Sequence, residues 1–207
     1  PPVSNPFAEK LTAASQVFNG FGKTLGLVQV DELGTLETPI ALTNTLNVGL
    51  VHDAMVQYMI DLCQQDGVPL RSVNPIVCEC NDASLNDICH RAVTQTHVMH
   101  AIQNASADFE EGAIGCGRGT TCHGLKGGVG SASRLVALGN EVYHVGVLVQ
   151  TNHGLFNDLM INGRQISEYA TVSPTPDQGS CIVILATDAP LTDRQLWRVI
   201  RRASVGL

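Results

Sequence analysis

Apolar residues recur with helical spacing in two stretches of the chain, and terminal charges predict a helix in a third. From residue 49 to about 65 they stand three or four positions apart, which predicts an amphipathic helix that stops at Gly67. Residues 94–105 show the same spacing, and Thr94 is suited to cap the start of that helix. A third helix is expected over residues 191–204, because an acidic residue begins it and three arginines end it, which suits the helix dipole.

Runs of alternating or continuous apolar residues predict strands between these helices. The predicted strands cover residues 38–48, 74–80, 134–138, 141–151, 159–161 and 180–187. The run 141–151 is apolar on both faces and is therefore expected at the centre of a sheet. Two short apolar runs, 16–21 and 25–30, are separated by glycines and predict a hairpin or a meander. Strands and helices in this order predict a layered α+β sandwich over a single domain, residues 1–207.

Composition narrows the classes of function that the chain can have. With 19 acidic and 12 basic residues, the net charge is −7, and no stripe of lysine and arginine is present, so nucleic acid is not expected as a partner. No apolar run reaches the roughly 18 residues that cross a bilayer, so no membrane partner is expected. The seven cysteines are odd in number and irregularly spaced, which predicts reduced thiols in a cytoplasmic protein.

A glycine-rich segment, residues 110–130, invites comparison with a phosphate-binding loop. Leu125 interrupts the Gly-Lys pair that such loops carry, and no serine or threonine follows Lys126. The better interpretation is a loop that packs closely against another backbone. An intermediate alternative is that its amide groups and Lys126 help to shape a wall of the active site.

Several cysteines and histidines also suggest a metal site at first sight. No Cys-x-x-Cys pair occurs around Cys78 and Cys80 or elsewhere in the sequence. No further cysteine or histidine stands at a typical metal-ligand spacing from the pairs Cys89-His90 and Cys122-His123, so no metal site is predicted. His153 draws attention because it follows Asn152 at the end of the predicted central strand.

Ser180 occupies the first position of a predicted buried strand, directly after Gly179. The ordinary interpretation is a serine that happens to begin a strand, and no Gly-x-Ser-x-Gly elbow is present. The functional interpretation is an amino-terminal nucleophile. Cleavage after Gly179 would free the α-amine of Ser180, which could act as general base for its own hydroxyl. The permissive backbone of glycine and the proline-rich connector 172–178 suit such a cleavage.

Five segments in order along the chain carry a resemblance to a known family. They are residues 37–49 (ETPIALTNTLNVG), 85–88 (LNDI), 124–134 (GLKGGVGSASR), 146–152 (GVLVQTN) and 179–191 (GSCIVILATDAPL). The chain resembles the self-processing aminopeptidases of the S58 type, which include the L-aminopeptidase/D-alanine esterase-amidase and the β-peptidyl aminopeptidases. The resemblance implies an αββα sandwich similar to amino-terminal-nucleophile hydrolases but differently connected.

The resemblance also implies a set of site residues. Ser180 matches the nucleophile exposed by cleavage after Gly179, and Asn152 matches the asparagine that stabilises the oxyanion. Glu79 is expected to bind the amine of the substrate, and Asn81 stands where some members carry a tyrosine near the active site. No cofactor and no metal are implied.

At the level of the whole protein, the resemblance implies further segments before Pro1 and after Leu207. Residues 1–179 and 180–207 would then belong to two processed chains, assembled as an oligomer of heterodimers. The expected activity is hydrolysis of short peptides, amino-acid amides or esters. Two alternatives remain: an unprocessed, non-catalytic relative that binds small amines, and an acetyltransferase of related fold, against which Ser180 argues because those enzymes use threonine.

Overall fold

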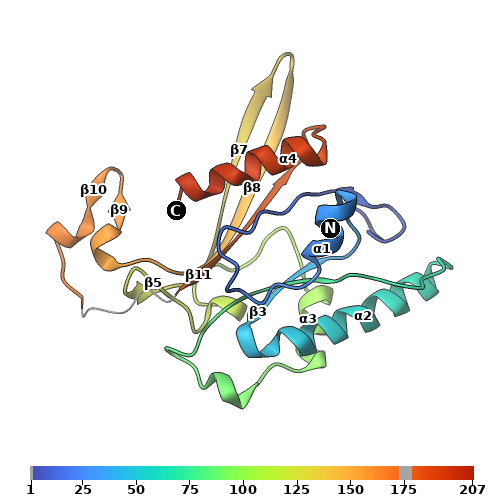
Figure 1. The fold of residues 1–207 in the computed structure, drawn as a ribbon, viewed down its shortest axis with the longest axis horizontal. Coiled ribbons are helices and arrows are strands. Elements are labelled where there is room, and N and C mark those ends of the chain that lie inside the picture. The colour runs from blue at the N-terminus through green and yellow to red at the C-terminus, as the bar shows by residue number, and fades with distance from the viewer. Residues whose placement is uncertain (1, 173–178) are drawn as a thin grey trace. The chain divides into compact units, whose positions relative to one another are not determined.

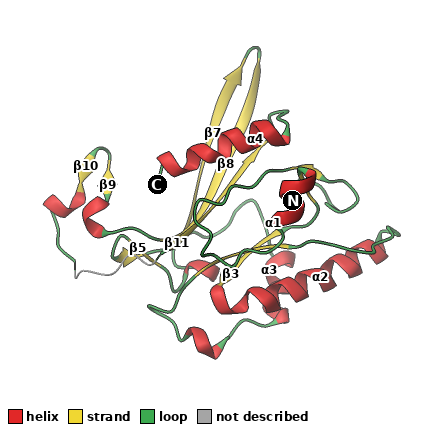
Figure 2. Cartoon of the chain, in the orientation of Figure 1, coloured by secondary structure: helices red, strands yellow, loops and turns green. Residues whose placement is uncertain are grey.

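The structure is a computed structural model that describes residues 2–172 and 179–207 (Figure 1). The chain forms two compact units, each assembled from separate segments. Unit 1 consists of Pro1–Cys78, Ala92–Ala107 and Ala189–Leu207, and unit 2 of Glu79–Arg91 and Asp108–Asp188. Within the described residues, the α-helices belong to unit 1, whereas unit 2 consists of strands and short 3₁₀ helices, so the chain as a whole combines helices with strands (Figure 2), as expected of an α+β protein. Most of the predicted connector 172–178 lies outside the described residues.

The core of unit 1 forms around its longest helix, α2 (Val48–Gln65), which confirms the strongest helix prediction. Val51, Met55 and other apolar residues on one face of α2 are buried against Val77 and Val98. Val77 belongs to β4 (Ile76–Cys80), which pairs with β3 (Ile40–Asn44), and Val98 belongs to α3 (Gln95–Gln103). Helices α2 and α3 pack together in unit 1 (Figure 1).

The ends of these helices follow from local sequence. Gly67 takes φ +66° directly after α2, where a left-handed residue lets Val68 N–H reach the carbonyl of Cys63 at 2.8 Å. Thr94 caps α3 through its side chain, which accepts from the backbone N–H of His97. The predicted strand 38–48 is shorter than expected, because a 3₁₀ helix, Thr45–Asn47, already begins the turn into α2.

The prediction of a hairpin or a meander within residues 16–30 is wrong. A short helix, α1 (Leu27–Leu33), lies there instead, between Gly26 at φ +87° and Gly34 at φ +64°. A Cβ at Gly26 would lie 2.4 Å from the carbonyl oxygen of Pro75, so only glycine allows this close approach. Strands β1 (Leu11–Thr12) and β2 (Thr35–Leu36) pair with each other beside α1.

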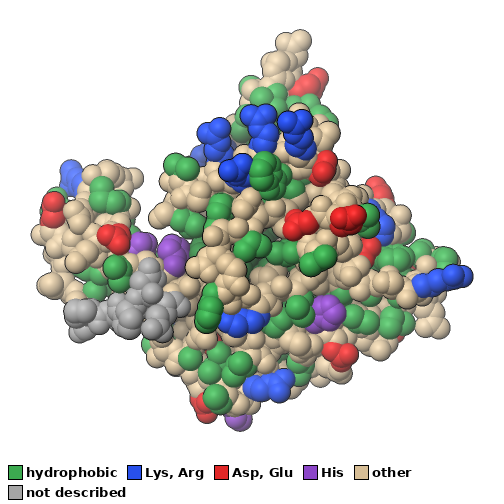
Figure 3. Space-filling view, in the orientation of Figure 1, with side chains coloured by type: hydrophobic (Ala, Val, Ile, Leu, Met, Phe, Trp, Pro, Cys, Tyr) green, Lys and Arg blue, Asp and Glu red, His purple; other side chains and the backbone are tan. Residues whose placement is uncertain are grey.

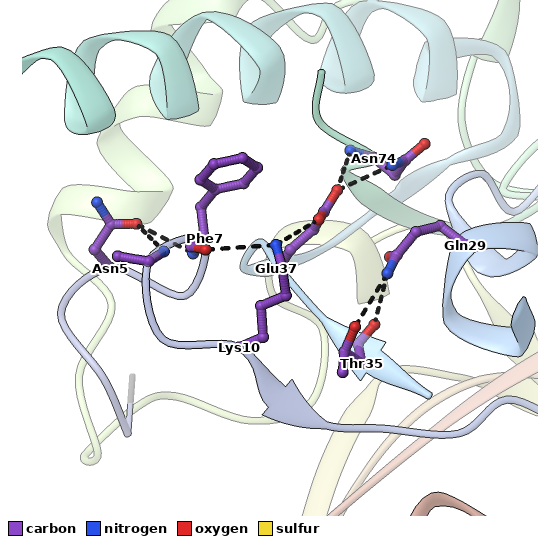
Figure 4. Close-up of polar contacts among 8 residues, drawn as sticks. Asn5, Phe7, Lys10, Gln29, Thr35, Glu37 and Asn74 are labelled. Carbon is purple, nitrogen blue, oxygen red and sulfur yellow. Dashed lines mark hydrogen bonds and ion pairs between the residues drawn. The ribbon is translucent and has the colours of Figure 1, made fainter. Parts of the chain in front are cut away.

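Buried Glu37 anchors the amino-terminal segment of unit 1 (Figure 4). Its carboxylate accepts hydrogen bonds from Lys10 Nζ at 2.9 Å and from the backbone and side chain of Asn74 at 2.8 and 2.9 Å. Although burial opposes ionisation, these hydrogen bonds hold the pKa of Glu37 below its usual value. A buried carboxylate that is fully hydrogen-bonded therefore fixes residues far apart in sequence.

The last helix of unit 1 is α4 (Asp193–Ile200), followed by a 3₁₀ helix, Arg201–Val205. Thr192 caps its start, and Gln195 completes the capping box. Arg198, Arg201 and Arg202 stand at the carboxyl end, as predicted from the helix dipole. Lys and Arg side chains gather over α4 in the space-filling view (Figure 3).

Unit 2 contains an antiparallel sheet of three strands in the order β11-β8-β7. The strands are β7 (Val129–Leu138), β8 (Glu141–Asn152) and β11 (Ser180–Thr187). The strand predicted to be central is β8, and the sheet confirms it. Smaller hairpins accompany this sheet: β5 (Thr121–Cys122) with β6 (Leu125–Lys126), and β9 (Met160–Ile161) with β10 (Arg164–Gln165). Further 3₁₀ helices are Ile88–His90, Gly115–Gly117, Phe156–Asp158 and Ile166–Glu168.

The glycine-rich segment packs closely against other backbone, as the sequence analysis expected. A Cβ at Gly117 or at Gly128 would lie 2.7 or 2.5 Å from the carbonyl oxygen of Gly112. Lys126 directs its ammonium to the carbonyl oxygens of Gly117, Thr120 and Gly127, at 2.7, 3.1 and 2.6 Å. Since an ammonium has three protons to donate, Lys126 closes this loop rather than presenting a charge to a phosphate.

None of the helices within residues 2–172 and 179–207 is both long and apolar enough to cross a membrane.

Candidate active site

Ser180 and Asn152 lie directly opposite each other in the sheet of unit 2. Ser180 begins β11, Asn152 ends β8, and the antiparallel register pairs the two residues. Directly opposed residues in such a ladder project their side chains from the same face. The side-chain amide of Asn152 accordingly donates from Nδ2 to Ser180 Oγ at 3.5 Å. The structure thus brings the predicted nucleophile and the predicted oxyanion donor together.

Thr121 fixes the orientation of the Asn152 amide. Its backbone N–H donates to Asn152 Oδ1 at 3.0 Å, so the oxygen of the amide faces β5 and the NH₂ group faces Ser180. Asn152 is also buried, with 7 % of its surface exposed. A donor held in place before the reaction needs no reorganisation when negative charge develops beside it. Sequence spacing offered no signal for Thr121, because the contact bridges 31 residues.

A glycine is required at position 179 because a side chain would not fit there. A Cβ at this position would lie 2.0 Å from the carbonyl oxygen of Asn152 and 2.5 Å from His153 Cα. Its φ lies outside the left-handed region, so steric room, rather than the backbone freedom expected from the sequence, explains why glycine precedes Ser180. The peptide unit joining residues 179 and 180 is therefore held tightly against the end of β8.

Glu79 and Asn81, the predicted substrate-binding residues, lie at and just after the end of β4. Glu79 is buried, with 3 % of its surface exposed. Asn81 is exposed, and its Oδ1 accepts the backbone N–H of Ala83 at 2.9 Å, which forms a tight turn after the strand. Cys80, which stands between them, reaches Ser180, and this places the end of β4 beside the nucleophile.

The buried polar residues of unit 2 lie on β4, in the loop after β4, in the glycine-rich segment and on β8. They are Glu79, Asp82, Thr120, Gln150 and Asn152. Charged and amide side chains are seldom fully buried unless they are paired or serve a function. Gln150 Nε2 donates to the Cys116 carbonyl at 3.1 Å, and Asp82 accepts from Asn86 at 2.7 Å. The Gln150 contact thus ties the glycine-rich segment to β8, and the Asp82 contact closes the loop after β4 on itself.

Cys80 contributes a contact that the sequence analysis missed. Its thiol donates to the backbone carbonyl of Gln150 at 3.7 Å and shares a hydrogen bond with Ser180. Burial raises the pKa of Cys80 to about 11, although the hydrogen bond with Ser180 opposes this shift. Burial likewise raises the pKa of Cys116 to about 12. Both thiols therefore stay protonated at neutral pH.

The raised thiol pKa values predict a clear order of alkylation. Iodoacetamide at pH 8 is expected to modify exposed Cys89 first and to modify Cys80 and Cys116 at least about 100-fold more slowly, because thiols with such pKa values are almost entirely protonated. Mass spectrometry of peptides sampled over time measures the order. Modification of Cys80 as fast as Cys89 would contradict the burial and protonation of this thiol.

Comparison with known proteins supports the resemblance read from the five segments. The sequence model of peptidase family S58 matches residues 1–207. The chain is 38 % identical to the β-peptidyl aminopeptidase BapA of Sphingosinicella xenopeptidilytica over 222 residues, which cover the whole chain and 55 % of that protein. It is 37 % identical to BapA of Sphingosinicella microcystinivorans, over 94 % of the chain and 53 % of that protein. The chain thus spans about half the length of these relatives.

Two solved structures show the same fold. The PH0078 protein from Pyrococcus horikoshii OT3 matches with a TM-score of 0.89 and 47 % identity, over 98 % of this chain and 57 % of its own. The L-aminopeptidase D-Ala-esterase/amidase from Ochrobactrum anthropi, described as a new variant among the Ntn hydrolase fold, matches with a TM-score of 0.89 and 38 % identity, over 95 % of this chain and 55 % of its own. These matches confirm the predicted fold class, and with the match to the family model they show that the chain belongs to peptidase family S58.

Proposed function

We propose that the protein containing this chain is a serine aminopeptidase or amidase that activates itself by cleaving the bond between Gly179 and Ser180. The observation that carries the proposal is the pairing of Ser180 Oγ with Asn152 Nδ2 at 3.5 Å, with the amide held in that orientation by Thr121. A hydroxyl beside a fixed amide donor is the arrangement that acyl transfer through a tetrahedral intermediate requires.

Self-processing would begin with attack of Ser180 Oγ on the carbonyl carbon of Gly179. The C–N bond of that peptide unit breaks, an ester to Oγ forms, and the nitrogen becomes the α-amine of Ser180 after taking up the hydroxyl proton. Water then hydrolyses the ester and leaves a carboxylate on Gly179. Because β11 is paired with β8 along eight residues, the new amino terminus would remain in the sheet after cleavage.

The freed α-amine would supply the general base for hydrolysis. An α-amino group has an ordinary pKa of about 7.7–8.0, so an appreciable share is unprotonated at neutral pH and can take the proton from Oγ. Oγ then attacks the substrate carbonyl, Asn152 Nδ2 donates to the developing oxyanion, and the amine returns the proton to the leaving group. Water hydrolyses the acyl-enzyme by the same steps. These reaction steps require no cofactor.

Substrates of this reaction would be short peptides, amino-acid amides or esters. Because the relatives are described as a β-peptidyl aminopeptidase and as an L-aminopeptidase D-Ala-esterase/amidase, we assign the reacting carbonyl to the amino-terminal residue of the substrate. We assign the amine of the substrate to the end of β4, where the Glu79 carboxylate would supply the opposite charge and Asn81 a polar contact. We further propose that the processed protein is a cytoplasmic oligomer of heterodimers.

A mass measurement on the purified full-length protein tests self-processing. We expect two chains whose sequences meet between Gly179 and Ser180, with serine found by amino-terminal sequencing, together with hydrolysis of amino-acid p-nitroanilides. A single uncleaved chain without hydrolysis would refute the proposal and favour a non-catalytic relative. Acetyl transfer to an amino acid without peptide hydrolysis would favour the acetyltransferase.

A further inference from the structure

The turn between β5 and β6 has an unusual backbone. His123 and Gly124 form this two-residue turn, and both have positive φ, +50° and +71°. Such a turn matches the twist of a hairpin, and glycine suits its second position. A histidine at positive φ is uncommon, and residues held in this region tend to cluster at functional sites. This type of turn thus sets the backbone conformation of His123 and, with it, the direction of its side chain.

The end of β8 brings a second histidine to the same turn. The backbone N–H of His123 donates to the carbonyl oxygen of His153 at 2.8 Å, and the two imidazole rings lie edge to face with centroids 5.5 Å apart. Cys122 precedes the turn. Its sulfur and one ring nitrogen from each histidine all lie within 4.8 Å of one another. All three residues belong to unit 2, and none takes part in the proposed reaction of Ser180.

Surrounding backbone orients the ring of His123. Its Nδ1 lies 2.9 Å from the carbonyl oxygen of Leu155, and because a carbonyl only accepts, Nδ1 carries the proton. This tautomer leaves the lone pair on Nε2. A histidine that donates one N–H to a carbonyl while its other nitrogen stays available is the usual arrangement of a metal ligand.

Gly154 makes room for this ring. A Cβ at that position would lie 2.4 Å from His123 Cε1, and its φ of +89° also favours glycine. The chain therefore keeps a glycine where any side chain would displace the His123 ring from His153. Together, the turn geometry, the oriented tautomer and the space left at Gly154 fix the position of the His123 ring.

We propose that Cys122, His123 and His153 bind a Zn²⁺ ion through one thiolate and two imidazole nitrogens. Thiolate and imidazole are the ligands that Zn²⁺ prefers, and three protein ligands leave the fourth tetrahedral position to a water molecule. With a Zn–S distance of about 2.3 Å and Zn–N distances of about 2.0 Å, the ligand atoms stand about 3.3–3.7 Å apart, so the side chains close by about 1 Å on binding. The thiol of Cys122 releases its proton to solvent, and both histidines bind as neutral rings.

Co²⁺ and Zn²⁺ added to the metal-free full-length protein test the site without reference to its activity. We expect one Co²⁺ per copy of the protein, processed or not, with the ultraviolet charge-transfer band of a cobalt–thiolate bond, displaced by one equivalent of Zn²⁺. Cys122→Ser should abolish the band, and His153→Gln should weaken Zn²⁺ binding at least about 100-fold while the thiol remains. Circular dichroism confirms that each variant is folded.

The second Cys-His pair of the chain, Cys89-His90, is a matched control. The double variant Cys89→Ser/His90→Gln removes the same residue types from an exposed site and should leave both the band and the affinity unchanged. Absence of the band in the unmodified protein, or its loss in this control, would overturn the proposal. Because the readout is metal binding, its failure is distinct from failure of the proposed peptidase activity.

Discussion

Replacing Ser180 with alanine is expected to leave the full-length protein as one uncleaved chain and to lower kcat/KM for amino-acid p-nitroanilides by about 10⁶-fold, the loss typical of removing a nucleophile. The reason is twofold. Oγ is the atom that attacks the Gly179 carbonyl, and the α-amine that would serve as base is never freed without that attack. Mass spectrometry and initial rates measure the two consequences on the same sample.

The variants Ser180→Cys and Ser133→Ala sharpen this test. Ser133 lies exposed on β7 of the same sheet, so its replacement should change neither cleavage nor rate. A cysteine at position 180 keeps a nucleophilic atom and should cleave, at an altered rate, which a role of Ser180 in packing alone would not explain. Full hydrolysis by an uncleaved Ser180→Ala protein would show that another residue is the nucleophile.

The elements that sequence patterns predicted well are those in which one local signal dominates. Helix α2 has regular apolar spacing and a glycine stop, and β8 is rich in β-branched residues, so the local sequence pattern indicates the conformation of each. The apolar residues 25–30 gave a wrong prediction, because periodicity in so short a run cannot distinguish helix from strand. What decides there is the contact between Gly26 and Pro75, which are 49 positions apart.

The residues of the candidate site also differ in whether a local sequence signal identifies them. Ser180 could be singled out from its own segment, since a hydroxyl at the start of a buried strand after glycine is a local signal. Asn152 was predicted from the family resemblance, and its contact with Ser180 depends on strand register, which no local pattern determines. Thr121 orients the amide from a distant hairpin. The His153 ligand likewise joins Cys122 and His123 only because β8 ends beside their turn.

Replacing Asn152 with aspartate is expected to lower kcat by about 10²–10³-fold, or about 2.7–4 kcal/mol, with a much smaller change in KM. The change keeps the size of the side chain and the oxygen that accepts from Thr121 N–H, but it replaces the NH₂ group that faces Ser180 with a second oxygen. A carboxylate there repels the oxyanion instead of stabilising it. Steady-state kinetics on the processed enzyme measures both parameters.

The variant Asn140→Asp separates this effect from that of added charge. Asn140 lies exposed in the turn between β7 and β8, so its replacement adds the same negative charge to the same sheet without altering the site, and kcat should stay unchanged. Asn152→Ala removes the donor without adding charge and should retain more activity than Asn152→Asp. If Asn152 served only to hold the strands together, its replacement would lower the fraction of the protein that is folded. The molecules that remain folded would then keep the full kcat. A folded Asn152→Asp enzyme with unchanged kcat would therefore exclude the amide from oxyanion stabilisation.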